Sequence, residues 1–260
     1  MILAAGRGQR MRPLTDVLPK PLLPVRGKPL MQWPMEALAR SGFVRQVVNT
    51  AWLGEQIPAY FEALRTDPGP RHADCGPVSL AGRQVYLNYS HEEQDFGHAL
   101  ETAGGVARAL PLLGPVFWVL AGDVHAPDFV FSPERVQCFI RSGLLAHLWL
   151  VPNPAHNPKG DFGLSEPDAR GLRLALNLGA DCGPRHTFST MALYRRELFA
   201  PPWCALAPGN PQGLSSPLAP LLRAAMDAGM VSAELYTGAW TDVGTPERLA
   251  ELNGATCAGL

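Results

Sequence analysis

The stretch that decides the fold is MILAAGRGQRMRPLTDVLPKPLLPV, residues 1–25, at the start of the chain. Its first five residues are apolar or small, which is typical of a short buried strand. The strand runs into Gly-Arg-Gly at residues 6–8, where glycine lets backbone N–H groups gather around an anion. Three cations follow in the same loop: Arg10, Arg12 and Lys20. The stretch therefore predicts a strand followed by an anion-binding loop.

Two common phosphate-binding motifs are excluded by the pattern of this loop. A P-loop needs G-x-x-x-x-G-K-[ST], which the chain lacks. A dinucleotide fingerprint needs Gly or Ala three residues after Gly8, and Met11 stands there instead. The loop must bind its anion in another way.

The composition limits the class of partner. The chain has 260 residues and a formal net charge of −1, so we expect no general attraction to nucleic acid or to a membrane. The apolar stretches are too short to cross a bilayer, and no charged segment precedes the N-terminal apolar residues as in a secretory signal. The five cysteines are scattered without a C-x-x-C pair, which favours reduced thiols. We therefore expect a cytoplasmic protein whose anion binding is local.

Strands and helices alternate along the first half of the chain. The pattern predicts strands at 1–5, 44–50, 84–90 and 115–121, helices at 29–42, 53–64 and 100–110, and an exposed excursion at 66–82. The stretch at 115–121 is continuously apolar, as in a central parallel strand that is covered on both faces. This order favours an α/β fold with a mostly parallel sheet.

The second half is less regular. It predicts strands at 144–151, 187–194, 231–236 and 240–243, and helices at 214–229 and from Thr245, with Thr245 as N-cap and Pro246 first in the helix. Because no linker or composition break interrupts the chain, we expect a single domain over residues 1–260.

Residues 3–25 closely resemble the signature of the sugar-phosphate nucleotidyltransferases, L-A-A-G-x-G-x-R-[ML]-x-P-[LT]-T-x-x-x-P-K-[PA]-[ML]-[LV]-P-[VI]. Similar segments recur in the family's order as ETAGG at 101–105, AGDV at 121–124 and TDVGT at 241–245. The resemblance implies a Rossmann-like nucleotidyltransferase fold with a central, mostly parallel mixed sheet flanked by helices. It also implies transfer of a nucleoside monophosphate from a nucleoside triphosphate to a sugar 1-phosphate, with release of pyrophosphate.

Two cations of the loop receive catalytic roles from this resemblance. Arg10 would bind the β- and γ-phosphates in a bidentate manner, which favours the departure of pyrophosphate. Lys20, fixed between Pro19 and Pro21, would contact the α-phosphate or the incoming sugar phosphate. The alternative for each is a surface cation without a ligand.

Two aspartates are the expected metal ligands. Asp123 directly follows the apolar strand, and ligands of α/β proteins bind at the carboxyl ends of strands. Mg²⁺ usually takes one or two carboxylates together with substrate phosphates. The resemblance implies Mg²⁺ as cofactor and Asp242 as the second carboxylate. Turn or cap aspartates are the alternative.

The nucleotide site is expected to extend from the first strand to two later segments. Backbone groups of residues 3–6 would read the pyrimidine edge, and the ETAGG segment would lie near base and ribose. The expected nucleotide-binding residues are Leu3, Ala4, Ala5, Gly6, Gly8, Gln9, Arg10, Lys20, Glu101, Gly104 and Ala121. Alternatively, Gly104 only relaxes the start of a helix. The histidines show no metal-ligand spacing. His98 and His125 neighbour this region, and a solvated or structural role is expected for both.

The acceptor is indicated by two further segments. The chain lacks the E-K-P segment of several hexose 1-phosphate enzymes and has KGDFGL at 159–164 and TFST at 187–190. It is most similar to the branch of the family that uridylylates N-acetylmuramate 1-phosphate. That resemblance places Asp161, Phe162, Thr187 and Thr190 on the acceptor side, although Thr190 stands where relatives usually have glycine.

Three functions stay open from the sequence. The first is Mg²⁺-dependent formation of UDP-N-acetylmuramate from UTP and N-acetylmuramate 1-phosphate, as in peptidoglycan recycling. The second is nucleotidylyl transfer from dTTP, UTP or GTP to glucose 1-phosphate or mannose 1-phosphate. The third is a non-catalytic regulatory subunit that senses nucleotide sugars. The presence of all four expected catalytic and metal-binding residues disfavours this third function: Arg10, Lys20, Asp123 and Asp242. A monomer or small homo-oligomer is expected.

Overall fold

The computed structural model describes residues 1–65, 77–179 and 182–254. The chain divides into two compact units, each built from segments that are distant in sequence. Unit 1 contains Met1–Ala99, Ala121–Phe131 and Ala239–Leu260, and unit 2 contains Leu100–Leu120 and Ser132–Gly238. The expectation of a single domain over residues 1–260 stays a prediction.

The sheet of unit 1 begins with the strand that opens the chain. Its strands are β1 (Ile2–Ala4), β4 (Arg45–Thr50), β6 (Arg83–His91) and β5 (Pro77–Leu80). β1 pairs with β4 and β4 with β6 in parallel, whereas β5 pairs with β6 antiparallel. Because Ile2 and Val48 are opposite each other and fully buried, the register is fixed by the core.

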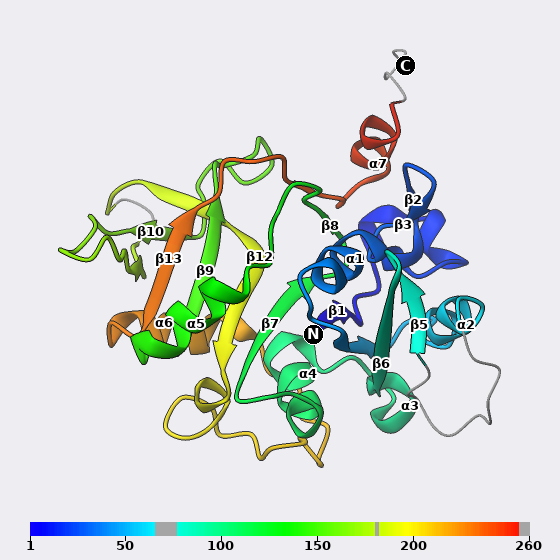
Figure 1. The fold of residues 1–260 in the computed structure, drawn as a ribbon, viewed down its shortest axis with the longest axis horizontal. Coiled ribbons are helices and arrows are strands. Elements are labelled where there is room, and N and C mark those ends of the chain that lie inside the picture. Colours follow the sequence, from blue (N-terminus) through cyan, green and yellow to red (C-terminus); the bar gives the residue numbers. More distant parts are fainter. Residues whose placement is uncertain (66–76, 180–181, 255–260) are drawn as a thin grey trace. The chain divides into compact units, whose positions relative to one another are not determined.

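Helices and two short strand pairs complete unit 1 (Figure 1). The helices are α1 (Gln32–Arg40), α2 (Gln56–Glu62), α3 (Glu92–Phe96) and α7 (Pro246–Leu252). The pairs are β2 (Pro24–Val25) with β3 (Lys28–Pro29) and β8 (Val124–His125) with β14 (Thr241–Asp242). A buried apolar cluster packs Met11 of the opening loop against Val243 and Leu249, so the loop is anchored to the last helix.

The sheet of unit 2 is centred on three long strands, β13 (Val231–Leu235), β9 (Ala146–Val151) and β12 (Arg185–Arg195), which lie side by side (Figure 1). β13 is parallel to β9, and β9 is antiparallel to β12. β12 also pairs with β7 (Val116–Ala121) and β10 (Phe162–Leu164), and β10 pairs with β11 (Ala175–Leu176). Among the described residues of unit 2, β7 pairs with β12, and the two strands are antiparallel. The prediction that β7 is a parallel strand is therefore wrong for this pair.

Three helices belong to unit 2: α4 (Glu101–Ala109), α5 (Pro133–Ser142) and α6 (Leu218–Asp227). The sequence-based prediction had no helix at α5. Its start is nevertheless marked, because Ser132 is the N-cap and accepts a hydrogen bond from Arg135 N, with Pro133 in the first position.

The α/β class is confirmed: a mixed sheet is flanked by helices, and β1, β4 and β6 run parallel. The predicted excursion at 66–82 is wrong in its last part, where Pro77–Leu80 forms β5 and turns into β6. The part at 66–76 lies outside the described residues. No helix among the described residues is long and apolar enough to cross a membrane.

Candidate functional site

The opening loop turns back on itself after β1. Gly8 has φ +66°, and an added Cβ would lie 3.1 Å from both Lys20 Cβ and Thr15 Cγ2. The Thr15 hydroxyl donates a hydrogen bond of 2.9 Å to the Gly8 carbonyl, and Trp52 Nε1 donates one of 2.8 Å to the Thr15 carbonyl. Glycine is needed here because L residues with a side chain rarely adopt this conformation. The turn places Lys20 beside the glycines.

A cavity of about 340 Å³ in unit 1 brings together the residues that the sequence selected. Its lining comes from three segments: Gly6, Gly8, Gln9, Arg10, Met11 and Lys20 from the loop, Asp123 after β7, and Gly244 after β14. Five predicted nucleotide-binding residues and one predicted metal ligand thus share one cavity. Among the described residues, the Arg10 side chain has no hydrogen bond or ion pair, and it is exposed.

Lys20 and Asp123 form an ion pair at this cavity. The Lys20 side chain is 11% exposed and that of Asp123 33% exposed. A buried ammonium requires a partner, since desolvation of an unpaired charge costs several kcal/mol, on the order of the whole stability of a small domain. Before Asp123, Gly122 N donates a 2.8 Å hydrogen bond to the Leu3 carbonyl, and a Cβ at Gly122 would lie only 3.0 Å from that carbonyl oxygen.

The other two arginines of the loop make contacts with protein groups. The Arg7 guanidinium lies 3.8 Å from the centre of the Trp52 ring, in a cation–π arrangement. Arg12 Nε lies 2.8 Å from Asp16 Oδ1, four residues later and at the surface. Arg10 is therefore the arginine of the loop that lines the cavity, together with Lys20.

Asp242 lies beside Asp123 through backbone pairing. Asp242 is opposite Val124 in the β8–β14 pair, and Val243 N donates a 2.9 Å hydrogen bond to the Asp123 carbonyl. Among the described residues, no group of three or more His, Cys, Asp or Glu side chains could hold a metal ion. Asp123 lines the cavity and Asp242 is its backbone neighbour, and one or two carboxylates together with substrate phosphates and water are the ligands that Mg²⁺ usually takes.

A buried polar chain that sequence reasoning missed fixes the end of β1. Asn49 Oδ1 accepts a 3.0 Å hydrogen bond from Ala4 N, and Asn49 Nδ2 donates one of 2.6 Å to Glu92 Oε1. Glu92 is fully buried. These hydrogen bonds fix the backbone at Ala4, in the stretch where the edge of the base is expected to bind. No spacing in the sequence links residues 4, 49 and 92, so only the fold reveals it.

A larger cavity of about 530 Å³ lies at the carboxyl ends of β4 and β6. Thr50 and His91 line it, and the Thr50 hydroxyl lies 2.9 Å from His91 Nδ1. None of its lining residues belongs to the predicted phosphate- or metal-binding set. We therefore place the chemistry in the smaller cavity. His125 is buried and packs edge-on against Trp33 at 5.0 Å, in keeping with a structural role.

The ETAGG segment belongs to unit 2, where it opens α4. Glu101 is exposed and has φ +59°, a conformation that is unusual for a residue with a side chain. Gly104 is buried, and an added Cβ would lie 2.7 Å from the Leu214 carbonyl. Asn210 Nδ2 donates to both the Gly104 and Leu214 carbonyls, at 3.3 and 2.9 Å. Close packing against the Leu214 carbonyl thus explains why glycine stands at position 104. A role of Gly104 in nucleotide binding stays a prediction.

The predicted acceptor residues hold a loop of unit 2 in place. Asp161 accepts hydrogen bonds from Phe188 N at 2.8 Å and from Asn157 Nδ2 at 3.2 Å. The Thr187 hydroxyl donates to Asn153 Oδ1 at 3.0 Å. Phe162 is buried, 4% exposed. These contacts order the loop between β9 and β10, and direct binding of the acceptor by these residues stays a prediction.

Thr190 lies in a β-bulge of β12. The pairing with β9 shifts register between Phe188 and Ala192, and Thr190 has φ +64°. Its hydroxyl donates a 2.6 Å hydrogen bond to the Ser189 carbonyl. A left-handed conformation favours glycine, which the family resemblance leads us to expect here, and it makes threonine strained.

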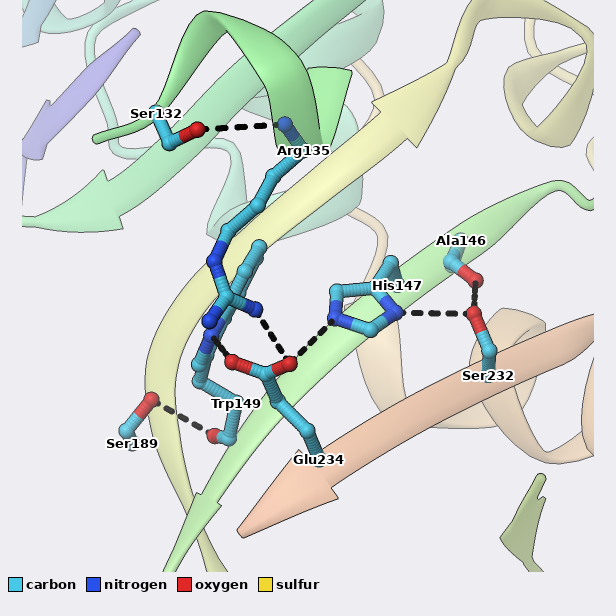
Figure 2. A network of polar contacts seen from close by, with 8 residues as sticks. All are labelled: Ser132, Arg135, Ala146, His147, Trp149, Ser189, Ser232 and Glu234. Atoms are coloured by element: carbon cyan, nitrogen blue, oxygen red, sulfur yellow. Dashed lines mark hydrogen bonds and ion pairs between the residues drawn. The ribbon is translucent and has the colours of Figure 1, made fainter. Parts of the chain in front are cut away.

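A polar network supports the same bulge from β9 and β13 (Figure 2). Glu234 accepts hydrogen bonds from Trp149 Nε1 and from Arg135 of α5. The Trp149 carbonyl accepts one of 2.6 Å from the Ser189 hydroxyl. His147 lies beside Glu234 and is 2.8 Å from Ser232 Oγ, and burial lowers its pKa to about 4. The sequence did not indicate this network.

Comparisons with known proteins agree with the geometry. The family model described as nucleotidyl transferase matches residues 1–174. The chain is 44% identical over 252 residues to the N-acetylmuramate alpha-1-phosphate uridylyltransferase of Neisseria meningitidis serogroup B, covering 96% of this chain and 95% of that protein. It is 36% identical over 126 residues to the UTP–glucose-1-phosphate uridylyltransferase of Synechocystis, covering 47% of this chain and 30% of that protein.

Solved structures show the same fold. A UDP-glucose pyrophosphorylase crystallised with UDP-glucose superposes with a TM-score of 0.71 at 16% identity, over 98% of this chain and 96% of that one. The motif-bearing loop, the cavity that it lines and the family match over most of the sequence lead to one conclusion: the chain belongs to the nucleotidyl transferase family.

Proposed function

We propose that this protein transfers UMP from UTP to N-acetylmuramate 1-phosphate and releases pyrophosphate. The observation that carries the proposal is the cavity lined by Arg10, Lys20 and Asp123, in a chain 44% identical over 96% of its length to an enzyme named for this reaction. A phosphate oxygen of the sugar phosphate attacks the α-phosphorus of UTP. The bond to the bridging oxygen breaks, and pyrophosphate leaves with that electron pair.

The proposed residue roles follow from charge. Arg10 is exposed at the cavity and binds the β- and γ-phosphates, whose charge grows as pyrophosphate leaves. Lys20 is held rigidly by the loop and binds the α-phosphate region. Asp123 and Asp242 would hold Mg²⁺, which when bound neutralises phosphate charge. The backbone of residues 3–6, fixed through Asn49, would read the uracil edge.

The acceptor follows from the similarity to the Neisseria protein over nearly the full length of both chains, which includes the segments around Asp161 and Thr187. The relative named for glucose 1-phosphate matches only about half of this chain. A glucose 1-phosphate or mannose 1-phosphate acceptor is therefore the second candidate. Arg10, Lys20, Asp123 and Asp242 are all present, which disfavours a non-catalytic subunit.

A substrate panel tests the proposal. Purified protein is incubated with Mg²⁺, one of four nucleoside triphosphates, and N-acetylmuramate, glucose or mannose 1-phosphate, while pyrophosphate release is followed. We expect release with UTP and N-acetylmuramate 1-phosphate to exceed that of every other pair. Faster release with a hexose 1-phosphate would favour the second candidate, and no release with any pair would favour the regulatory one.

A further inference from the structure

Arg248 forms two hydrogen bonds with Asp242, the second of the two expected metal ligands. Arg248 Nη1 donates hydrogen bonds to Asp242 Oδ1 and, at 2.9 Å, to the Asp242 carbonyl oxygen. One guanidinium thus fixes both the side chain and the backbone of the residue. The Arg248 side chain is 16% exposed and that of Asp242 25% exposed, so the pair is mostly shielded from water.

Arg248 lies in the first turn of α7, close to Asp242. Thr245 is the N-cap, and its hydroxyl accepts a hydrogen bond from Arg248 N at 3.5 Å. Pro246 holds the first helical position, and Leu249, next to Arg248, is anchored in the core beside Val243. The helix start is therefore rigid, and the guanidinium reaches back over the preceding loop.

Gly244 makes room for this arrangement. A Cβ at Gly244 would lie 2.4 Å from Arg248 Nη2 and 3.3 Å from Asp242 Oδ2. A side chain at Gly244 would therefore require the end of the Arg248 side chain to shift. Gly244 also lines the cavity with Arg10, Lys20 and Asp123, so the Arg248–Asp242 contact lies directly behind that wall.

We propose that Arg248 is a positioning residue that orients the Asp242 carboxylate beside Asp123 for a divalent cation. The inference rests on the proposed function, because it needs the two aspartates to share a metal. Groups that hydrogen-bond a metal ligand fix its orientation, and their loss typically lowers metal affinity about 10- to 100-fold. An exposed ion pair would contribute little, but this pair is mostly shielded and is fixed at two points.

One guanidinium nitrogen, Nη1, makes both contacts. Lysine would keep the positive charge on a compact, flexible ammonium and lose the fixed plane of the guanidinium. Arg248→Met removes the charge and both hydrogen bonds but keeps an apolar stem, whereas Arg248→Lys keeps the charge. Arg135→Met is a matched control, because it removes an arginine–carboxylate pair from unit 2.

The test is Mn²⁺ binding to the full-length protein without substrates, followed by electron paramagnetic resonance. We expect Arg248→Met to weaken Mn²⁺ binding about tenfold or more, Arg248→Lys to weaken it less, and Arg135→Met to match the wild type. The Mg²⁺ concentration for half-maximal turnover should rise in Arg248→Met, with turnover recovering at saturating Mg²⁺. Thermal melts of all variants check the fold, and Arg248→Lys carries the test if Arg248→Met unfolds.

Asp242→Asn separates this inference from the proposed function. If Asp242→Asn loses Mn²⁺ binding while both Arg248 variants bind as the wild type does, the positioning role is wrong and the metal site stands. Tighter binding in Arg248→Met would also overturn the role, since Arg248 would then compete with the cation. Unchanged binding in Asp242→Asn would refute the metal site itself.

Discussion

At the scale of single residues, the site depends on backbone positions where only certain side chains fit. Gly8 has φ +66° and touches Lys20, and Gly244 lies against the Arg248 guanidinium. Both glycines belong to segments that resemble the family, but the reason that glycine is needed at each is a tertiary contact. Thr190 is the opposite case, because a β-branched residue stands in a left-handed conformation that favours glycine.

Replacement of Thr190 tests whether that strain is real. A left-handed conformation costs a residue with a side chain about 1–2 kcal/mol, whereas glycine pays only its greater unfolded-state entropy. We expect the free energy of unfolding of Thr190→Gly to equal or exceed that of the wild type. Thr190→Ala, which keeps the strain and loses the hydroxyl, should be about 1 kcal/mol less stable than Thr190→Gly. Chemical denaturation measures both, and the reverse order would show that Thr190 is unstrained.

At the scale of elements, strand β13 contacts strand β9 through a partly buried polar pair as well as through its backbone. His147 and Glu234 come from neighbouring strands, and Arg135 reaches Glu234 from α5 (Figure 2). Burial lowers the pKa of His147 to about 4, an effect that Glu234 opposes and Arg135 supports. The pairing of these strands should therefore respond to pH.

The sign of the pH effect follows from the two states of His147. Its pKa is near 6.5 in the unfolded chain and about 4 in the folded one, so the unfolded state binds the proton first as the pH falls. The stabilisation by neutral His147 is complete above about pH 6.5 and is lost between pH 6.5 and 4, with an upper value of roughly 3 kcal/mol. Denaturation curves of wild type and His147→Gln across this range should diverge. Parallel curves would show that His147 titrates normally.

The sequence predicts elements well where local signals are strong. α7 starts where Thr245 and Pro246 indicate, and Pro34 lies in the first turn of α1, where proline is tolerated. The start of α5 at Ser132–Pro133 carries the same type of signal, a serine N-cap followed by proline. The strands β10 and β11 have three and two residues, too short for a periodic pattern, and they exist only through pairing.

The residues of the candidate site likewise fall into those that the sequence predicts and those that only the fold reveals. The opening motif selected Arg10 and Lys20, the place of Asp123 after an apolar strand selected that residue, and the structure brings all three to one cavity. Asn49, Glu92 and Arg248 support that cavity from distant segments, and no spacing rule connects them to it. Residues that are expected to touch a ligand carry a family signature, whereas residues that contact them from distant segments are recognised only after folding.

At the scale of the whole molecule, Arg10 and Lys20, for which catalytic roles are predicted, lie in unit 1, and the expected acceptor residues lie in unit 2. The expected nucleotide-binding residues are divided, because Glu101 and Gly104 belong to unit 2 and the residues of the opening loop to unit 1. The nucleotidyl transferase family match covers 174 residues and includes segments of both units. A cytoplasmic location and a monomer or small homo-oligomer stay predictions.

The measurement that tests the account most directly is turnover of the two metal-ligand variants with the proposed substrates. Pyrophosphate release from UTP and N-acetylmuramate 1-phosphate is compared for the wild type, Asp123→Asn and Asp242→Asn, each shown by circular dichroism to be folded. We expect robust release by the wild type and a loss of about 100-fold or more in each variant, because uncompensated phosphate charge raises the barrier by several kcal/mol. Wild-type rates in either variant, or no release by the wild type, would contradict the account.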